Sequence, residues 1–141
     1  MELVGNINSN KQKYLYFRTE ATDANDDATG DSACFPASSL MGMQPTADST
    51  LTLYFKSMVR RSPDGSVDSA NSLDNHDTIQ LTLSSANTHL VAIQAIVEAI
   101  NTSSLSVIVV ANDDSGGTEY LSESGISACG TITVAAAYAN S

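Results

Sequence analysis

Basic residues are scarce in this sequence. Its 141 residues hold 6 Lys and Arg against 16 Asp and Glu, which gives a formal net charge of -10. A surface this acidic repels phosphate groups, so we expect neither a nucleic acid nor an anionic membrane as a partner. Long apolar runs are also missing: no stretch reaches the roughly 18 apolar residues of a membrane-spanning helix. The first residues lack the charged and apolar regions of a secretory signal, so none is expected.

Cysteine is rare as well. Cys34 and Cys129 lie far apart, and each is surrounded by apolar or small residues. Neither has a second Cys or a His at the spacing of metal ligands, so a metal site at the thiols is not expected. The sequence favours two buried free thiols. A disulfide between two strands is the alternative in an oxidising compartment.

Catalytic motifs are missing too. The sequence has two histidines, His76 and His89, and no G-x-S-x-G element. The glycine pair at 116–117 is not followed by the lysine of a phosphate loop. His76 precedes Asp77, which leaves a metal site open, but a solvated loop histidine is the simpler interpretation. We therefore expect no enzyme, no catalytic residue and no cofactor.

Acidic side chains gather in residues 20–31, EATDANDDATGD. The pattern D-x-N-x-D resembles the start of a calcium loop, but alanine stands at the sixth position and Cys34 at the twelfth, so this is not an EF-hand. Weak cation binding and a solvated turn are the two hypotheses for this loop. Its candidate metal ligands are Asp23, Asp26, Asp27 and Asp31. A second acidic group with the same two interpretations consists of Asp64, Asp68, Asp74 and Asp77.

The densest apolar pattern lies in residues 77–111. The segment DTIQLTL (77–83) alternates apolar and polar residues, which predicts a strand with one buried face. The continuous run VIVV at 107–110 predicts a strand over 105–111 that is covered on both faces. Two arrangements remain open. The strands share a sheet and run parallel, with a right-handed crossover, or the intervening helix packs beside an antiparallel sheet.

A helix is predicted between these strands, over residues 88–101. Asn87 or Thr88 can cap it, because a short polar side chain satisfies a free N–H of the first turn. Apolar residues at three- and four-residue steps form a stripe that must lie on another apolar surface. The stripe consists of Leu90, Ile93, Val97 and Ile100, and is widened by Val91 and Ile96.

The rest of the chain is mostly β-prone. Residues 38–46 are expected to be irregular, since Pro45 excludes a regular helix beyond it. The open edge of a strand over 13–19 is available to pair with a neighbour's sheet. Alternation predicts strands over 13–19, 32–35, 49–58 and 126–138.

These elements predict one α+β domain over residues 1–141. We expect a mostly β sheet or sandwich of about five or six strands, with one main helix (88–101) packed on it. A short N-terminal arm of about residues 1–11 precedes it.

Three stretches carry a resemblance to a known group: YLYFRTEATDANDDATGDSACFPASSLMGMQPTADSTLTLYF, DTIQLTLSSANTHLVAIQAIVEAIN and ISACGTITVAAA. They resemble small structural proteins of marine tailed phages, especially cyanophages. The resemblance covers most of the chain and rests on structural patterns, so it transfers no catalytic residue. It implies a virion component made in the host cytoplasm, either a decoration or cement protein outside the capsid or a minor tail or tube protein.

Two sets of residues are candidate interface residues in this role. Leu40, Met41 and Met43 form an apolar patch that suits a subunit interface, with packing in the domain's own core as the alternative. Arg60 and Arg61, the only adjacent basic pair, either contact a neighbour's acidic loop or end a strand.

Three functions are therefore compared. The first is a non-enzymatic capsid decoration protein that self-associates and binds the major capsid protein or another virion protein. The second is a tail- or fibre-associated module that binds a carbohydrate or a host-surface ligand. The third is a metal-assisted hydrolase that uses the aspartate loops and His76.

Overall fold

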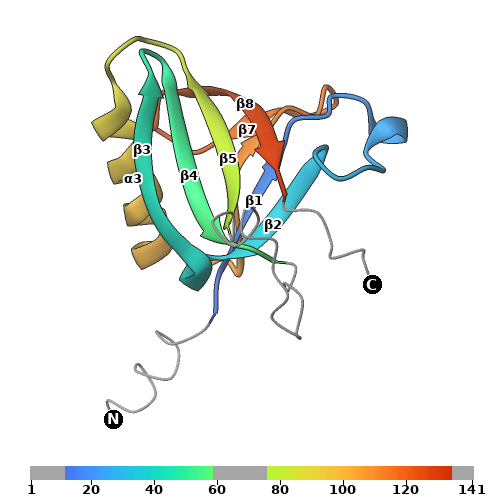
Figure 1. Ribbon diagram of the computed structural model, residues 1–141, viewed down its shortest axis with the longest axis horizontal. Coiled ribbons are helices and arrows are strands. Elements are labelled where there is room, and N and C mark those ends of the chain that lie inside the picture. Colours follow the sequence, from blue (N-terminus) through green and yellow to red (C-terminus); the bar gives the residue numbers. More distant parts are fainter. Residues whose placement is uncertain (1–11, 59–75, 135–141) are drawn as a thin grey trace, which may run out of the picture.

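Two four-stranded β-sheets and one main helix form the domain (Figure 1). The computed structural model describes residues 12–58 and 76–134. The first sheet has the strand order β2-β1-β6-β7, and the second has the order β3-β4-β5-β8. The strands are β1 (Tyr14–Arg18), β2 (Ser32–Pro36), β3 (Leu40–Ala47), β4 (Thr50–Lys56), β5 (His76–Leu83), β6 (Val107–Asn112), β7 (Glu119–Tyr120) and β8 (Ile126–Thr133). The helices are the short η1 (Asp23–Asn25) and η2 (Ala37–Ser39) and the main helix α3 (His89–Thr102).

The predicted α+β class, with one helix on a β sandwich, is confirmed. The described residues contain eight strands rather than five or six. The two strands that flank the helix lie in different sheets, β5 in the second and β6 in the first. They therefore do not share a sheet, and α3 is the connection that leads the chain from one sheet to the other. No helix of the described residues is long and apolar enough to cross a membrane.

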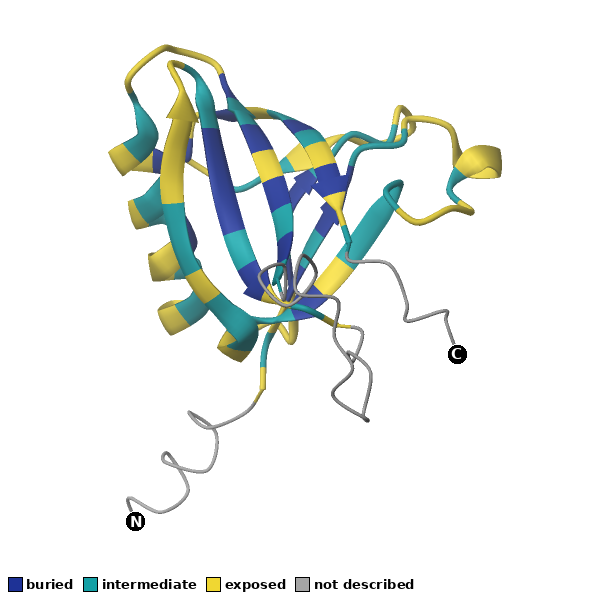
Figure 2. Ribbon diagram, in the orientation of Figure 1, coloured by how far each residue is buried: buried dark blue, intermediate teal, exposed yellow. Residues whose placement is uncertain are grey.

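Three phenylalanines join the two sheets. Phe17 and Phe35 come from the first sheet and Phe55 from the second, and all three are fully buried. The rings of Phe35 and Phe55 stack with their centroids 4.2 Å apart, and Phe17 packs edge-on against both, at 6.3 and 5.8 Å. Such aromatic pairs add about 0.5–1.5 kcal/mol each beyond the area they bury. Figure 2 shows buried residues along the strands of both sheets.

The helix buries part of the predicted stripe, together with two alanines that the prediction did not include. Ala92 and Ile96 are fully buried, and Ile93, Ala99 and Ile100 pack against the core. The stripe members Leu90 and Val97 are instead 63% and 42% exposed, and Val91 is 46% exposed. The helix packs against β4 of one sheet and β6 of the other. The small side chains of Ala92 and Ala99 on this face allow close approach to both sheets, which the prediction from the largest side chains missed.

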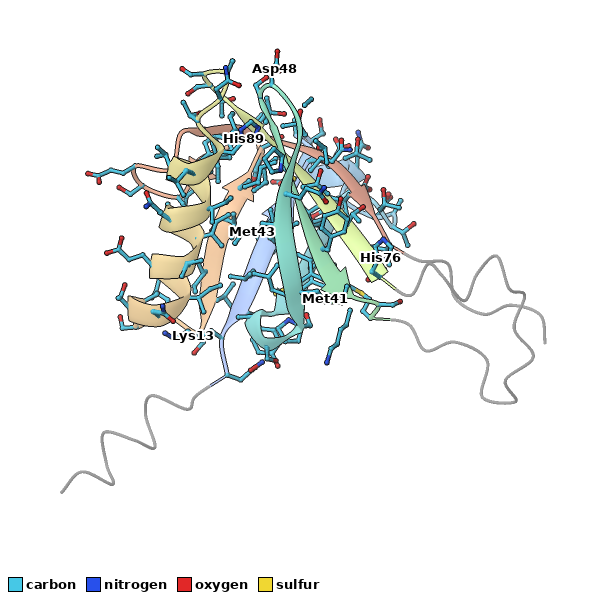
Figure 3. All side chains as sticks on the ribbon, turned by 60° about the vertical axis from the view of Figure 1, so that its left-hand side comes forward. Lys13, Met41, Met43, Asp48, His76 and His89 are labelled. Carbon is cyan, nitrogen blue, oxygen red and sulfur yellow. The ribbon has the colours of Figure 1, made fainter. Side chains whose placement is uncertain are left out.

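Both ends of α3 are tied to the sheets (Figure 3). A ring N–H of His89 donates to the carbonyl oxygen of Ala47, at the end of β3, over 2.9 Å. The Lys13 ammonium, just before β1, donates to the carbonyl oxygen of Ile100 over 2.7 Å. A cation at this end satisfies a free carbonyl and opposes the helix dipole. The predicted side-chain cap is wrong: Thr88 makes no capping hydrogen bond, and Asn87 precedes it with φ of 63°.

Two further expectations about strands are wrong. Residues 38–46 are not irregular, because Leu40–Ala47 form β3. This strand tolerates Pro45 since it lies at the edge of its sheet, where one side of the backbone has no partner strand. The strand over 13–19 offers no open edge, because β1 lies between β2 and β6 and pairs with both.

The buried face of α3 predicts unequal effects of two alanine substitutions. Ile96→Ala removes a fully buried side chain and should lower the free energy of unfolding by about 2–5 kcal/mol. Leu90→Ala, on the exposed side of the same helix, should change it by no more than about 0.5 kcal/mol. Urea unfolding of both variants measures the difference. A larger loss for Leu90→Ala would restore the stripe predicted from the sequence.

Candidate functional site

The acidic loop is organised around Arg18, the last residue of β1. Its side chain is only 9% exposed. The guanidinium lies 3.0 Å from a carboxylate oxygen of Asp23, 3.5 Å from one of Asp26 and 3.8 Å from one of Asp114. Its Nε also donates to the carbonyl oxygen of Glu20 over 2.7 Å. A fixed positive charge therefore lies among the carboxylates that would have to surround a metal ion.

The remaining oxygens of the loop hold its own backbone in place. Asp31 accepts hydrogen bonds from the backbone N–H groups of Asp27 and Ala28, at 3.1 and 2.8 Å. Asp26 accepts one from the Ser32 hydroxyl at 2.8 Å. In residues 12–58 and 76–134, no group of three or more His, Cys, Asp or Glu side chains is placed to hold a metal. The arrangement is that of a structural turn. The sequence signal for it was one arginine, Arg18, two residues before the acidic segment.

A second polar cluster joins the two sheets. Asp113 follows β6, and its two carboxylate oxygens accept from the backbone N–H of Cys129, in β8, at 3.2 and 3.1 Å. The Tyr120 hydroxyl donates to the same carboxylate. Burial, followed by the hydrogen bond to Asp113, raises the pKa of Tyr120 to about 12. The Thr19 hydroxyl donates to the carbonyl oxygen of Cys129 over 3.1 Å. Both the N–H and the carbonyl group of Cys129 are therefore hydrogen-bonded to side chains that flank strands of the first sheet.

The two thiols are free and occupy different surroundings. Cys129 is buried between the sheets, whereas Cys34 is exposed on β2, so the expectation of two buried thiols is wrong for Cys34. Burial raises the pKa of both thiols, and that of Cys129 reaches about 12 with the added effect of the Asp113 charge. Cys129 therefore stays protonated and inert near neutral pH.

His76 and Asp77 do not form a site together. They are neighbours in β5, so their side chains point to opposite faces of the sheet. Asp77 is fully buried, and its carboxylate accepts from the backbone N–H of Met58 over 3.0 Å. His76 lies on the outer face, with its ring 5.7 Å from that of Tyr54. Other candidates from the sequence lie outside the described residues: Arg60, Arg61, Asp64, Asp68 and Asp74.

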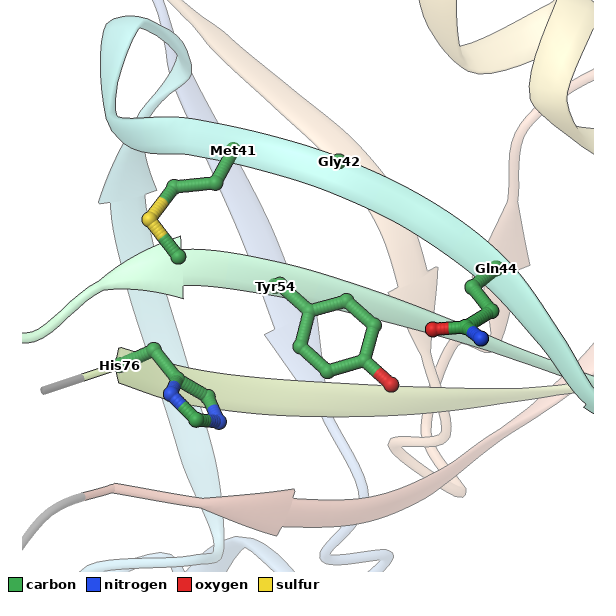
Figure 4. A pocket seen from close by; sticks show the side chains of 5 residues that line it. All are labelled: Met41, Gly42, Gln44, Tyr54 and His76. Atoms are coloured by element: carbon green, nitrogen blue, oxygen red, sulfur yellow. The ribbon is translucent and has the colours of Figure 1, made fainter. Parts of the chain in front are cut away.

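The predicted apolar patch is divided between core and surface. Leu40 and Met43 pack against the core, whereas Met41 is 54% exposed. Met41 lies beside a shallow depression of about 290 Å³ on the outer face of the second sheet (Figure 4). The residues that line the depression are Met41, Gly42, Gln44, Tyr54 and His76.

The outer faces of the two sheets differ in chemistry. That of the second sheet is rich in threonine, as expected of a face in contact with water, and includes Thr46, Thr78, Thr82, Thr131 and Thr133. The outer face of the first sheet carries a group of uncharged side chains, here called the apolar face, which consists of Tyr14, Tyr16, Cys34, Pro36, Val107 and Val109. The next row of the same outer face consists of Arg18, Ser32 and Asn112.

The apolar face was not identified from the sequence. Its inward neighbours Leu15, Phe17 and Ile108 are buried, as alternation requires, but its own residues are exposed or half-buried. Two signals pointed to it: a strand with apolar or aromatic residues on both faces at 14–17, and the unbroken run at 107–110.

Comparisons with known protein families, with curated proteins and with solved structures found no match to this chain.

The contacts of Arg18 generate a prediction about stability and metal binding. Arg18→Met keeps most of the apolar stem and leaves Asp23, Asp26 and Asp114 to repel one another. The melting temperature should fall by several degrees at low salt and by less at high salt, where repulsion is screened. Arg18→Lys should recover only part of the loss, because an ammonium lacks the planar fork of donors.

Calcium provides the second measurement on these variants. Added Ca²⁺ should leave the melting temperature of the wild type unchanged and raise that of Arg18→Met, since a ligand that binds the native state stabilises it. Equal calcium stabilisation of both proteins would show that the carboxylates bind metal despite Arg18.

Proposed function

We propose that this protein is a non-enzymatic structural protein of a phage particle, specifically a capsid decoration or cement protein. It stabilises the particle through self-association and through contact with the major capsid protein or another virion protein. The virion setting comes from the resemblance of its sequence to structural proteins of marine tailed phages. The observation that carries the proposal is an exposed apolar face on a domain with a net charge of -10.

An apolar face of this kind favours a role in assembly. Isolated exposed apolar residues are common on soluble proteins, but a contiguous patch marks a contact surface. Here the residues come from three adjacent strands, so the face is held rigidly by backbone pairing. A rigid surface loses little conformational entropy on association, which suits a protein that acts by shape.

The polar groups considered for catalysis have structural contacts instead. Asp23 and Asp26 pair with Arg18, Asp31 holds the turn at residues 27–28, and Asp77 accepts a backbone hydrogen bond. These contacts support a building role over the metal-assisted hydrolase, which needed the same aspartates as ligands.

Binding to capsids tests the proposal. Purified protein mixed with capsids that lack it should co-sediment with them and saturate at a fixed ratio to the major capsid protein. An unrelated acidic protein of similar size serves as the control for trapping and charge effects. Failure to co-sediment at any protein concentration would contradict the decoration role.

A second candidate function is favoured by the depression on the second sheet. The ring of Tyr54 offers an apolar surface against which a sugar ring can lie, and Gln44 offers both a donor and acceptors for hydroxyl groups. None of the five residues that line the depression is acidic, so a neutral carbohydrate is the ligand class it suits. This would be the function of a tail- or fibre-associated binding module.

Filling the depression tests this second candidate. A Cβ added at Gly42 meets no atom within 4 Å, so Gly42→Leu should fold normally and occupy the depression. If the module binds glycans on an array, Gly42→Leu should weaken binding by at least about tenfold, or about 1.4 kcal/mol. Gly117→Leu is the matched control, since Gly117 is equally open and lies outside the depression. Equal binding by both variants would exclude the depression.

A further inference from the structure

The outer face of the second sheet is polar but carries almost no charge. Its strands β3, β4, β5 and β8 contain one acidic residue, Asp77, and that side chain is fully buried on the opposite face. Lys56 and His76, which pair at one end of the sheet, are the only basic side chains on the outer side of these strands. In a chain with a net charge of -10, such a surface favours a neutral partner over an ionic one.

The polar groups of this face are not used within the fold. Of the hydrogen bonds among residues 12–58 and 76–134, none involves the side chains of Gln44, Thr78, Gln80 or Thr133. The loop carboxylates, in contrast, are committed to internal contacts. Amides and hydroxyls supply both donors and acceptors. The face can therefore form hydrogen bonds with a ligand rich in hydroxyl groups without losing a contact of its own.

Tyr54 provides the apolar contact of this face. In the register of the sheet, Tyr54 pairs with Gly42 on β3 and with Thr78 on β5. Gly42 has no side chain, and a Cβ added there meets no atom within 4 Å, so the flank of Tyr54 toward β3 is open (Figure 4). The half-buried ring of Tyr54 lies 5.7 Å from that of His76. An aromatic ring held in this way, with an open flank, suits the apolar side of a sugar ring.

The polar row continues beyond the depression. Thr78 pairs in turn with Thr133 on β8, so a line runs across the four strands from Gly42 through Tyr54 and Thr78 to Thr133. Adjacent strands lie about 4.8 Å apart, so this line is roughly 14 Å long. It is longer than a single sugar ring and matches a short chain of sugars. The depression occupies one end of the line, and hydroxyl groups follow it.

We propose that a neutral oligosaccharide binds in extended form along this line. One sugar ring lies in the depression against Tyr54, and the following sugars lie over Thr78 and Thr133. The inference rests on the second candidate function, a glycan-binding module, and deepens it by assigning the ligand as a chain rather than a single sugar. Each further sugar adds contacts of the same kind, so affinity should rise with chain length.

A series of glycans tests the dependence on chain length. The probes are single sugars and oligomers of glucose, mannose, galactose, xylose and N-acetylglucosamine, with uronate oligomers as the charged comparison. Binding is screened on an array and measured by titration calorimetry. A neutral oligomer should bind at least about tenfold more tightly than its single sugar, which corresponds to about 1.4 kcal/mol. Binding of the uronate oligomers alone would contradict the neutral ligand class.

Two hydroxyl groups beyond the depression provide the test by substitution. The double variant Thr78→Val and Thr133→Val keeps the shape of both side chains, suits a strand and removes both hydroxyls. It should weaken binding of the oligomer about fivefold or more, and leave binding of the single sugar unchanged. Thr118→Val, at an exposed position between β6 and β7, is the matched control and should change neither. Circular dichroism and melting temperatures verify that the variants fold.

The inference and the function on which it rests fail separately. Equal affinity for a single sugar and its oligomers would overturn the extended line and leave the depression as a glycan site. The same conclusion follows if the double variant binds the oligomer as tightly as the wild type does. Failure to bind any neutral glycan would overturn both the line and the glycan-binding module. The capsid role is measured independently, by co-sedimentation.

Discussion

The sandwich depends on the contact among Phe17, Phe35 and Phe55. It is the place where side chains of both sheets interpenetrate, and it fixes how β1 and β2 lie over β4. With the sheets held there, α3 can pack against both at once, because its small residues face the space between them. The exposed surfaces then follow from alternation: once one side of each strand is committed to this core, the other side must face outward.

Charged groups are used mainly to join parts of the fold. Arg18 collects the carboxylates of two loops, and Asp113 links the end of the first sheet to β8 of the second. The charged contacts of the domain therefore lie at the ends of loops and where the two sheets meet. The centre of the first sheet's outer face is left uncharged, so its surface chemistry is sharply divided between acidic loops and an apolar sheet.

The sequence predicted what depends on local periodicity. The strands that became β4 and β5 and the existence of α3 followed from two- and four-residue repeats. The features that depend on tertiary pairing were not predicted. Pro45 argued against regular structure where β3 lies, and nothing in the local sequence indicated that β1 lies between two partner strands. The buried side of α3 was predicted in part: Ile93, Ile96 and Ile100 belong to it, but its two alanines were missed because they matter by being small. The role of Arg18 could not be derived, since Asp114 reaches it from a distant part of the sequence.

The pairing of β1 with β6 has a consequence for synthesis. Tyr14 lies beside Val107, so β1 obtains one of its two neighbouring strands only after β6, far along the sequence, has been synthesised. Until then its hydrogen-bonding groups on that side, and the phenylalanine it contributes, lack their final environment. Strand pairings between residues so far apart in sequence slow folding and prolong the exposure of aggregation-prone apolar segments. The first sheet can therefore be completed only once β6 has been synthesised, and until then one edge of β1 is open to contact with other unfinished chains.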